Sequence, residues 1–209
     1  MKAFSWLFSF GLLASAGRVY NFDNAPLGQM PPGWTVAMTN HGAAPRWEIR
    51  KDTTAPTQPY VLAQVSTDPT DNRFPLAILN SPSLRDGEVS VRIKPVTGRG
   101  GEAGGLVWRY RDENNYYLVR ANARANDVAV YKIENGRRSA LMAGVKHPSP
   151  ANAWSILKIA VRGSRFQVYL DHRRILQGQD NTFSGPGRVG LWTAADSVTY
   201  FDDFRVYPR

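Results

Sequence analysis

Short runs of alternating apolar and polar residues follow one another along most of the chain, separated by glycine, proline or asparagine. Such alternation is typical of strands that face a core on one side and water on the other. It predicts strands at residues 88–96, 104–111, 116–123, 127–135, 155–163, 165–172, 187–193 and 198–207. Turn signals separate them, among them the segment 112–115 and the pair Asn135-Gly136. No long amphipathic helix pattern occurs, so the sequence predicts an all-β, two-sheet antiparallel sandwich.

The first third of the chain is less regular than the rest. Residues 46–51 and 60–65 have strand character, whereas 30–34 and 55–59 are rich in proline and resemble loops. Nothing in this part indicates a second domain. We expect its strands and loops to complete the same sandwich, so that residues 17–209 form one domain.

Residues 1–16 have the pattern of a secretory signal peptide. Lys2 supplies a positive start, an apolar run extends to Leu13, and Ala14, Ser15 and Ala16 form a small-residue cleavage site. The apolar run is too short for an ordinary membrane span. We therefore expect an exported protein, either periplasmic or extracellular, with no membrane span. The absence of cysteine argues against a lipid anchor.

The stretch 105–127 interleaves arginines with aromatic and small apolar residues. If 112–115 is a four-residue hairpin loop, Arg111 lies opposite Tyr116 and Arg109 opposite Leu118. One face is then apolar: Leu106, Trp108, Tyr110, Tyr117, Val119, Ala121 and Ala123. The other face gathers Arg109, Arg111, Tyr116, Arg120, Asn122 and Arg124. This second face is either a solvated surface or a binding groove, because guanidinium groups suit sugar hydroxyls and carboxylates.

Trp192 extends the polar face of that hairpin. It alternates with Arg188 and Gly190, whereas Val189 and Leu191 have the opposite parity. If the second pair belongs to the core, Trp192 lies on the polar face and can act as an aromatic platform for a sugar ring. A tryptophan packed under a loop accounts for the sequence equally well.

Composition and charge narrow the classes of function. The chain has 26 Lys and Arg against 17 Asp and Glu, a formal net charge of +9, but the basic residues are dispersed as singles and pairs. We interpret this charge as an aid to solubility that weakly steers acidic ligands. Export makes nucleic acid a poor partner. The absence of cysteine and the wide separation of the three histidines make a zinc site improbable. We expect a monomer.

A resemblance follows from the order of these motifs. The segments "GGLVWRYRDENNYYLVRANARANDVAVYKIENGRR", "WSILKIAVRGSRFQVYLDHRRIL" and "GRVGLWTAADSVTYFDDFRV" resemble concanavalin A-like and laminin G-like jelly rolls. Within these they are most similar to the bacterial exported group related to the 3-keto-disaccharide hydrolases. The resemblance covers roughly residues 20–207. It implies a jelly roll whose concave sheet commonly binds carbohydrate. It also implies a structural calcium near Asp202 or Asp203 together with Asp23, although the sequence offers calcium few ligands.

Catalysis finds little support in the sequence. Glycoside hydrolysis generally needs two carboxyl groups across the bond, yet no Asp or Glu occurs between Glu113 and Asp127. The Glu-x-Asp-x-x-Glu strand of related glucanases is also missing. Candidates elsewhere are Glu48, Asp52, Glu88, Glu102, Asp196 and Asp202, and they form no sequence pair.

Three hypotheses follow. The first is an exported carbohydrate-recognition jelly roll without evident catalysis, binding a glycan, neutral or anionic, on its concave sheet. The second is an enzyme that cleaves glycosides or 3-keto-glycosides. The third is an interaction module of the cell envelope. The first needs no cofactor apart from the calcium that the resemblance implies.

Overall fold

The computed structural model describes residues 17–148 and 150–209, which form strands, turns and bends only. The predicted signal segment, 1–16, lies outside these residues. In chain order the strands are β1 (Arg18–Tyr20), β2 (Trp34–Thr39), β3 (Trp47–Lys51), β4 (Tyr60–Gln64), β5 (Phe74–Leu79), β6 (Gly87–Thr97), β7 (Ala103–Asp112), β8 (Asn115–Asn122), β9 (Asp127–Glu134), β10 (Arg137–Lys146), β11 (Ser155–Arg162), β12 (Arg165–Leu170), β13 (Arg173–Gln179), β14 (Arg188–Thr193) and β15 (Val198–Pro208).

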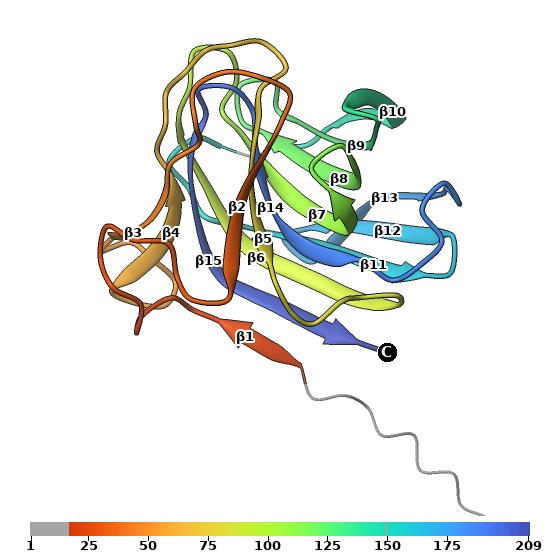
Figure 1. Ribbon diagram of the computed structural model, residues 1–209, viewed down its shortest axis with the longest axis horizontal. Helices are drawn as coiled ribbons and strands as arrows, with labels where there is room; N and C mark the ends of the chain where they lie inside the picture. The colour runs from red at the N-terminus through yellow and green to blue at the C-terminus, as the bar shows by residue number, and fades with distance from the viewer. Residues whose placement is uncertain (1–16, 149) are drawn as a thin grey trace, which may run out of the picture.

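The strands form two antiparallel sheets. The eight-stranded sheet has the order β13-β12-β11-β6-β15-β4-β3, with β1 paired to β15, and the seven-stranded sheet has the order β10-β9-β8-β7-β14-β5-β2. Figure 1 shows β1 beside β15 at one end of the larger sheet, and β7, β8 and β9 next to one another in the smaller one. The all-β, two-sheet antiparallel sandwich predicted from the sequence is therefore confirmed.

The main core lies between the two sheets and follows the predicted alternation. Val89, Val91 and Ile93 of β6 meet Leu106 and Trp108 of β7 in one buried cluster. The polar residues between them in β6, such as Ser90 and Arg92, are only partly buried, because they face outward from the eight-stranded sheet. Burying this alternate set is the main force that holds the sheets together.

A second apolar cluster lies on the opposite face of the seven-stranded sheet. Its buried members are Phe74, Leu76, Ile78, Ala103, Val107, Tyr110, Tyr116, Leu118, Ile133 and Trp192. The middle strands of this sheet are thus apolar on both faces, as the unbroken burial of β5 shows. The predicted polar face of this sheet, whether solvated or a groove, is wrong at its centre, where the side chains are apolar and buried.

All eight strands predicted from the alternation are present, as are the two expected at 46–51 and 60–65, and five more lie outside the predicted set. Two of the additional strands, β10 and β13, are the outermost strands of their sheets, and β2 and β5 belong to the irregular first third. Edge strands with both faces partly exposed have no strict alternation, so periodicity does not reveal them. Among the residues described, no helix has the length and apolarity of a membrane span.

Candidate functional site

A bulge at Arg109 changes which residues of the β7–β8 hairpin share a face. Trp108 pairs with Tyr117, but the next registered pair is Asp112 with Asn115, so the register shifts by two residues between them. Arg109 has a positive φ of 50°, which is uncommon for a residue with a side chain. Beyond the bulge, Tyr110 joins Tyr116 on the outer face instead of entering the main core. The predicted assignment of Tyr110 to the core side is wrong for this reason.

Arg109 itself points away from the outer face and ties three loops together. Its guanidinium donates to the carbonyl oxygens of Phe183, at 2.6 Å, of Arg85, at 3.3 Å, and of Gly163. Only 3 % of the residue is exposed, and burial lowers the pKa of Arg109 from its ordinary value. The structure therefore places this residue of the predicted groove in a structural role, because both of its terminal nitrogens donate to carbonyl oxygens inside the protein.

Arg111 also leaves the predicted group. Its guanidinium lies 4.9 Å from the ring centre of Phe183, and Phe183 belongs to the cluster between the sheets. The side chain therefore lies at the edge of the core side and not beside Tyr116. The prediction that Arg109 and Arg111 share a face with Tyr116 is wrong, and the bulge is the physical reason.

Arg120 remains on the outer face, but it is not free. It donates to Asp127 at 2.6 Å and its guanidinium lies 5.3 Å from the ring centre of Tyr131. Asp127 comes from the neighbouring strand β9, directly opposite Asn122. A carboxylate thus reaches this face although β8 itself carries none, which the sequence of the hairpin alone does not reveal.

Asn122 and Arg124 lie at the turn that joins β8 to β9. The Asn122 side chain accepts a hydrogen bond from the backbone N–H of Ala125 at 3.0 Å. Arg124 donates to the carbonyl oxygen of Arg99. These contacts hold the turn and the neighbouring 98–101 loop, so these two residues lie at one end of the face and not at its centre.

Trp192 lies on the predicted face, but beneath its surface. Val189 and Leu191 enter the main core, and Trp192 packs against Phe74 with ring centres 5.3 Å apart. None of Trp192 is exposed, so its ring supports the face from below and offers no platform to a ligand. Tyr116 is equally buried and shares a 2.7 Å hydrogen bond with Thr39. Burial raises the pKa of the Tyr116 phenol above its ordinary value.

Three arginines lie over the rings of Phe74, Tyr110 and Tyr131, which we call the aromatic floor. Arg138 lies 5.1 Å from the ring centres of both Phe74 and Tyr131, and Arg188 lies 5.0 Å from that of Tyr110. Arg120 is the third. A guanidinium stacked on a ring is held in place by the π face while its N–H groups remain available at its edge.

Arg138, like Arg188, is a functional candidate that the sequence prediction missed. It comes from β10, a strand whose residues are mostly exposed and do not alternate. The signal that could have found it is Asn135-Gly136, which continues β9 into a hairpin and so brings Arg138 beside Ile133 of β9.

A depression of about 430 Å³ opens beside Arg138. Its lining consists of Asn40, His41, Asp71, Asn72, Phe74, Gly136, Arg137 and Arg138. These residues come from the ends of β2 and β10 and from the loop before β5. The depression offers guanidinium, amide and carboxylate groups above an aromatic base, which is the usual composition of a site that fixes a polar ligand.

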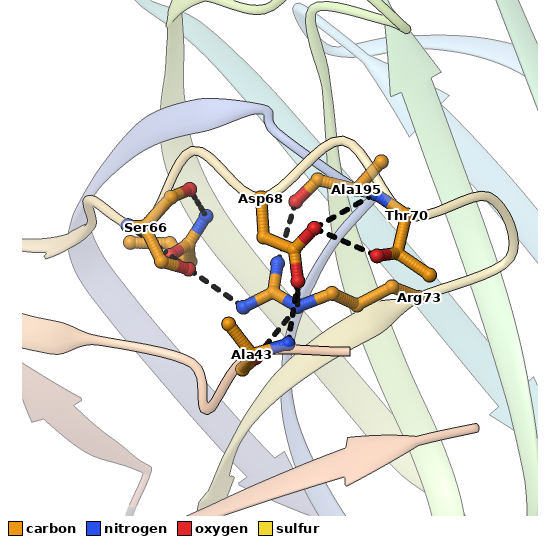
Figure 2. A network of polar contacts seen from close by, with 7 residues as sticks. Ala43, Ser66, Asp68, Thr70, Arg73 and Ala195 are labelled. Carbon is orange, nitrogen blue, oxygen red and sulfur yellow. Dashed lines mark hydrogen bonds and ion pairs between the residues drawn. The ribbon is translucent and has the colours of Figure 1, made fainter. Parts of the chain in front are cut away.

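Buried Arg73 holds the loops that line this depression (Figure 2). Its three nitrogens donate to the carbonyl oxygen of Ala43 at 2.8 Å, to that of Ala195 at 2.7 Å and to the hydroxyl of Ser66 at 2.8 Å. Asp68 lies 3.7 Å from its Nε. The guanidinium thus fixes three loops that are far apart in the sequence, and it lies beside Asn72 and Phe74 of the depression.

Asp68 strengthens the same frame. Its carboxylate accepts hydrogen bonds from the hydroxyl of Thr70, at 2.7 Å, and from the backbone N–H groups of Thr70 and Ala43. These bonds, with that from the Thr70 hydroxyl the largest cause, lower the pKa of Asp68 to about 2.

The carboxylates considered for catalysis have other partners. Glu48 lies between Arg46 and Arg50, at 2.7 Å from each. Asp52 pairs with Lys94, Glu88 with Lys158 and Arg209, and Asp196 accepts the backbone N–H groups of Arg99 and Gly100. Glu102 directly precedes β7. None of these contacts brings two of the candidates together across the aromatic floor.

The three carboxylates suggested for calcium contact separate groups. Asp23 accepts the N–H of Tyr60, Asp202 accepts the N–H and hydroxyl of Thr57, and Asp203 pairs with Arg92 and Arg205. Across residues 17–148 and 150–209, no group of three or more Asp, Glu, His or Cys side chains lies close enough to share a metal ion. The calcium prediction thus gains no support from the arrangement of these residues.

Comparison with known proteins connects this architecture to carbohydrate-active proteins. No family model matches the chain. A segment of 122 residues, 56 % of the chain, is 38 % identical to a levanase of Bacillus subtilis (strain 168). The matched region spans only 17 % of that levanase, about a sixth of its length.

Solved structures share most of the fold. A carbohydrate binding module of Bacillus subtilis, CBM66, superposes with a TM-score of 0.64 at 29 % identity and covers 83 % of this chain and 95 % of its own. A β-glucanase of Bacillus licheniformis superposes with a TM-score of 0.61 at 13 % identity, covering 91 % of this chain and 98 % of its own. These likenesses confirm that the sandwich is a jelly roll, as the sequence motifs indicated.

Proposed function

We propose that this jelly roll is an exported, non-catalytic carbohydrate-binding domain that holds a glycan on the outer face of its seven-stranded sheet. The observation that carries the proposal is the set of three arginines, Arg120, Arg138 and Arg188, held over aromatic rings beside an open polar depression. Side chains fixed in this way lose little entropy when a ligand binds. Their edge N–H groups suit the hydroxyls of a sugar, and the half-buried ring of Tyr131 supplies an apolar surface.

The comparisons suggest which sugar to test first. One relative is named a levanase and one structural neighbour a carbohydrate binding module. We therefore take levan, a fructan, as the first candidate ligand. The free donors of Arg138 and Arg188 also suit the carboxylate of a uronic acid, so an acidic glycan is the second candidate.

Absence of catalysis is part of the proposal. Five of the six carboxylates that the sequence offered, all but Glu102, are ion-paired or accept hydrogen bonds from the backbone. A glycoside hydrolase of either stereochemical class needs two carboxyl groups about 5–10 Å apart across the bond. Incubating the protein with levan and with 3-keto-glycosides should release no sugar, and any turnover would favour the enzyme hypothesis.

An interaction module of the cell envelope receives less support. Binding through an apolar surface would need a contiguous exposed patch. Of the exposed large apolar side chains in the described chain, Val19 and Tyr207 lie on the paired strands β1 and β15, whereas Leu27, Val36 and Val145 come from other segments.

Isothermal titration with levan fragments tests the glycan-binding proposal. Arg138→Gln should weaken binding about tenfold, because a guanidinium bonded to a ligand contributes about 1.5 kcal/mol. Arg111→Gln is the matched control, since this exposed arginine lies beside Phe183 on the core side, and its affinity should stay that of the wild type. Equal losses in both variants, or failure of levan to bind, would contradict the proposal.

Export is tested separately. Expression of the full chain followed by mass spectrometry of the periplasm and medium should find a protein that begins near Gly17, because residues 14–16 have the pattern of a cleavage site. Recovery of only the uncleaved chain from the cytoplasm would contradict it.

A further inference from the structure

The outer face of the eight-stranded sheet, on the far side of the sandwich from the proposed glycan site, carries a row of three connected depressions. They have volumes of about 310, 400 and 410 Å³. Glu88 and Tyr169 line both the first and the second, and Arg165 and Gln167 line both the second and the third. The row crosses the five neighbouring strands β15, β6, β11, β12 and β13. Four strand spacings of about 4.8 Å give it a length of roughly 19 Å.

This row collects positive charge that is dispersed in the sequence. The cations that line it are Arg92, Lys158, Arg162, Arg165, Arg205 and Arg209. The carboxylates in the lining are Glu88 and Asp203, so positive charges exceed negative ones by four. The formal net charge of the whole chain is +9, so a large share of the excess lies along one band. Such a band attracts polyanions.

The ion pairs within the row leave donors unused. Asp203 is shared by Arg92, at 3.4 Å, and Arg205, at 3.1 Å. Glu88 is shared by Lys158, at 3.2 Å, and Arg209, at 3.1 Å. Each carboxylate thus serves two cations. In the part of the chain that the structure describes, Arg162 and Arg165 are exposed and have no carboxylate within 4.0 Å. These two arginines are cross-strand partners, and their like charges repel each other until an anion lies between them.

The uncharged residues of the row suit a sugar chain. Tyr169 lies between the first two depressions, its ring centre 4.4 Å from Nζ of Lys158 and its hydroxyl bonded to Gln167 at 2.8 Å. Gln177 and Gln179 line the third depression. Amide groups bond hydroxyls as donors and acceptors alike, and a half-buried tyrosine ring offers an apolar surface to a sugar ring.

We propose that this band is a second binding surface, for the chain of an anionic polysaccharide, independent of the glycan site on the seven-stranded sheet. Repeated depressions along a line match a polymer with regularly spaced acid groups. The arginines and Lys158 bind its anionic groups, while Tyr169 and the glutamines contact the neutral parts of each sugar. A lipid surface matches less well, because the lining offers Tyr207 as its exposed large apolar side chain and membrane binding needs buried apolar area.

Affinity electrophoresis and titration of the full protein with polygalacturonate test this proposal, with neutral dextran as the control polymer. The wild type should bind polygalacturonate in about 50 mM salt, lose most of this binding in about 0.5 M salt, and ignore dextran. Arg162→Gln/Arg165→Gln should weaken binding by up to about thirtyfold, since it removes two cations and each exposed ion pair contributes up to about 1 kcal/mol.

The matched control is Arg137→Gln/Arg138→Gln, which removes the same charge from the other sheet. It should bind polygalacturonate within about twofold of the wild type and lose levan binding, whereas Arg162→Gln/Arg165→Gln should retain levan binding. If the glycan proposal fails, neither double variant loses levan binding. The outcome for polygalacturonate does not depend on that result. Thermal unfolding of both double variants should match that of the wild type, because all four side chains are exposed.

Several results would overturn the proposal. Equal losses in the two double variants would indicate unspecific attraction by net charge, and a loss confined to Arg137→Gln/Arg138→Gln would assign the acidic polymer to the other sheet. Tighter binding to anionic phospholipid vesicles or to duplex DNA than to polygalacturonate, abolished by Arg162→Gln/Arg165→Gln, would assign the band to those partners instead.

Discussion

The rings of Tyr110 and Tyr116 lie 5.9 Å apart on the outer face of the seven-stranded sheet, although an unbroken hairpin would place them on opposite faces. The bulge at Arg109 brings them together. It turns Tyr110 outward, where the ring lies under Arg188, and turns Arg109 inward, where the guanidinium ties three loops. One irregular residue therefore decides both the aromatic floor of the proposed site and the anchoring of the loops behind it.

Arg109→Ala should destabilise the protein but leave glycan binding by the folded protein unchanged. The change leaves the buried carbonyl oxygen of Phe183 without its donor and removes a charged partner from two others, a loss of about 2–4 kcal/mol. Urea unfolding measures it, and Arg111→Ala, with an exposed side chain, should cost less than about 0.5 kcal/mol. A stable Arg109→Ala variant that has lost glycan binding would instead support the ligand contact that the sequence suggested.

Arg73→Met should both destabilise the fold and weaken glycan binding. The apolar side chain leaves Asp68 and the carbonyl oxygens of Ala43 and Ala195 without their partner, at a cost of about 2–4 kcal/mol. Loops that line the depression would then lose their common anchor. Arg73→Lys keeps the charge but not the fork of donors, so it should restore only part of the stability. Full glycan affinity in a destabilised but folded Arg73→Met variant would show that the frame does not position the site.

Stability should fall as pH rises from about 4 to about 6 because of Asp202. Burial raises the pKa of this carboxyl group from its ordinary value of 3.8 to about 6. In that window the folded protein holds a proton that the unfolded chain has released. The stabilisation from this proton is therefore fully present below pH 3.8 and is lost as the pH rises through about 6. Its size is about 3 kcal/mol.

The variant Asp202→Asn isolates this contribution, because its side chain does not titrate. Urea midpoints measured at intervals across the same pH range should change less for this variant than for the wild type. Parallel curves for the two proteins would show that the Asp202 carboxyl group titrates normally in spite of its burial.

Removal of divalent metal should leave the thermal midpoint unchanged. Asp23, Asp202 and Asp203 accept hydrogen bonds or ion pairs from Tyr60, Thr57, Arg92 and Arg205. Calcium binding would require these contacts to break, since calcium takes six to eight oxygen ligands. Differential scanning calorimetry with excess chelator and then with added calcium measures the effect. A calcium-dependent rise in the midpoint, lost in Asp203→Asn, would restore the calcium hypothesis.

The sequence alone determined the class of fold and most of the inner core. Alternation at period two places Val89, Val91 and Ile93 on one side of a strand wherever that strand lies, because side chains of a strand alternate between its faces. It also placed Trp192 on the face opposite Val189 and Leu191. The jelly-roll motifs gave the order of the elements, and Asn135-Gly136 marked a turn that the structure contains.

The tertiary structure alone decided what each face of the sandwich can bind. The bulge at Arg109 depends on a local backbone conformation that the residue pattern does not predict. Arg138 reaches the aromatic floor only because the non-alternating strand β10 pairs with β9. Likewise, Arg92, Arg162 and Arg205 are distant in sequence but share one face because β15, β6 and β11 are neighbours in the sheet. Local patterns report which way a side chain points along its own strand. Strand order and register, set by packing across the whole chain, determine which side chains meet.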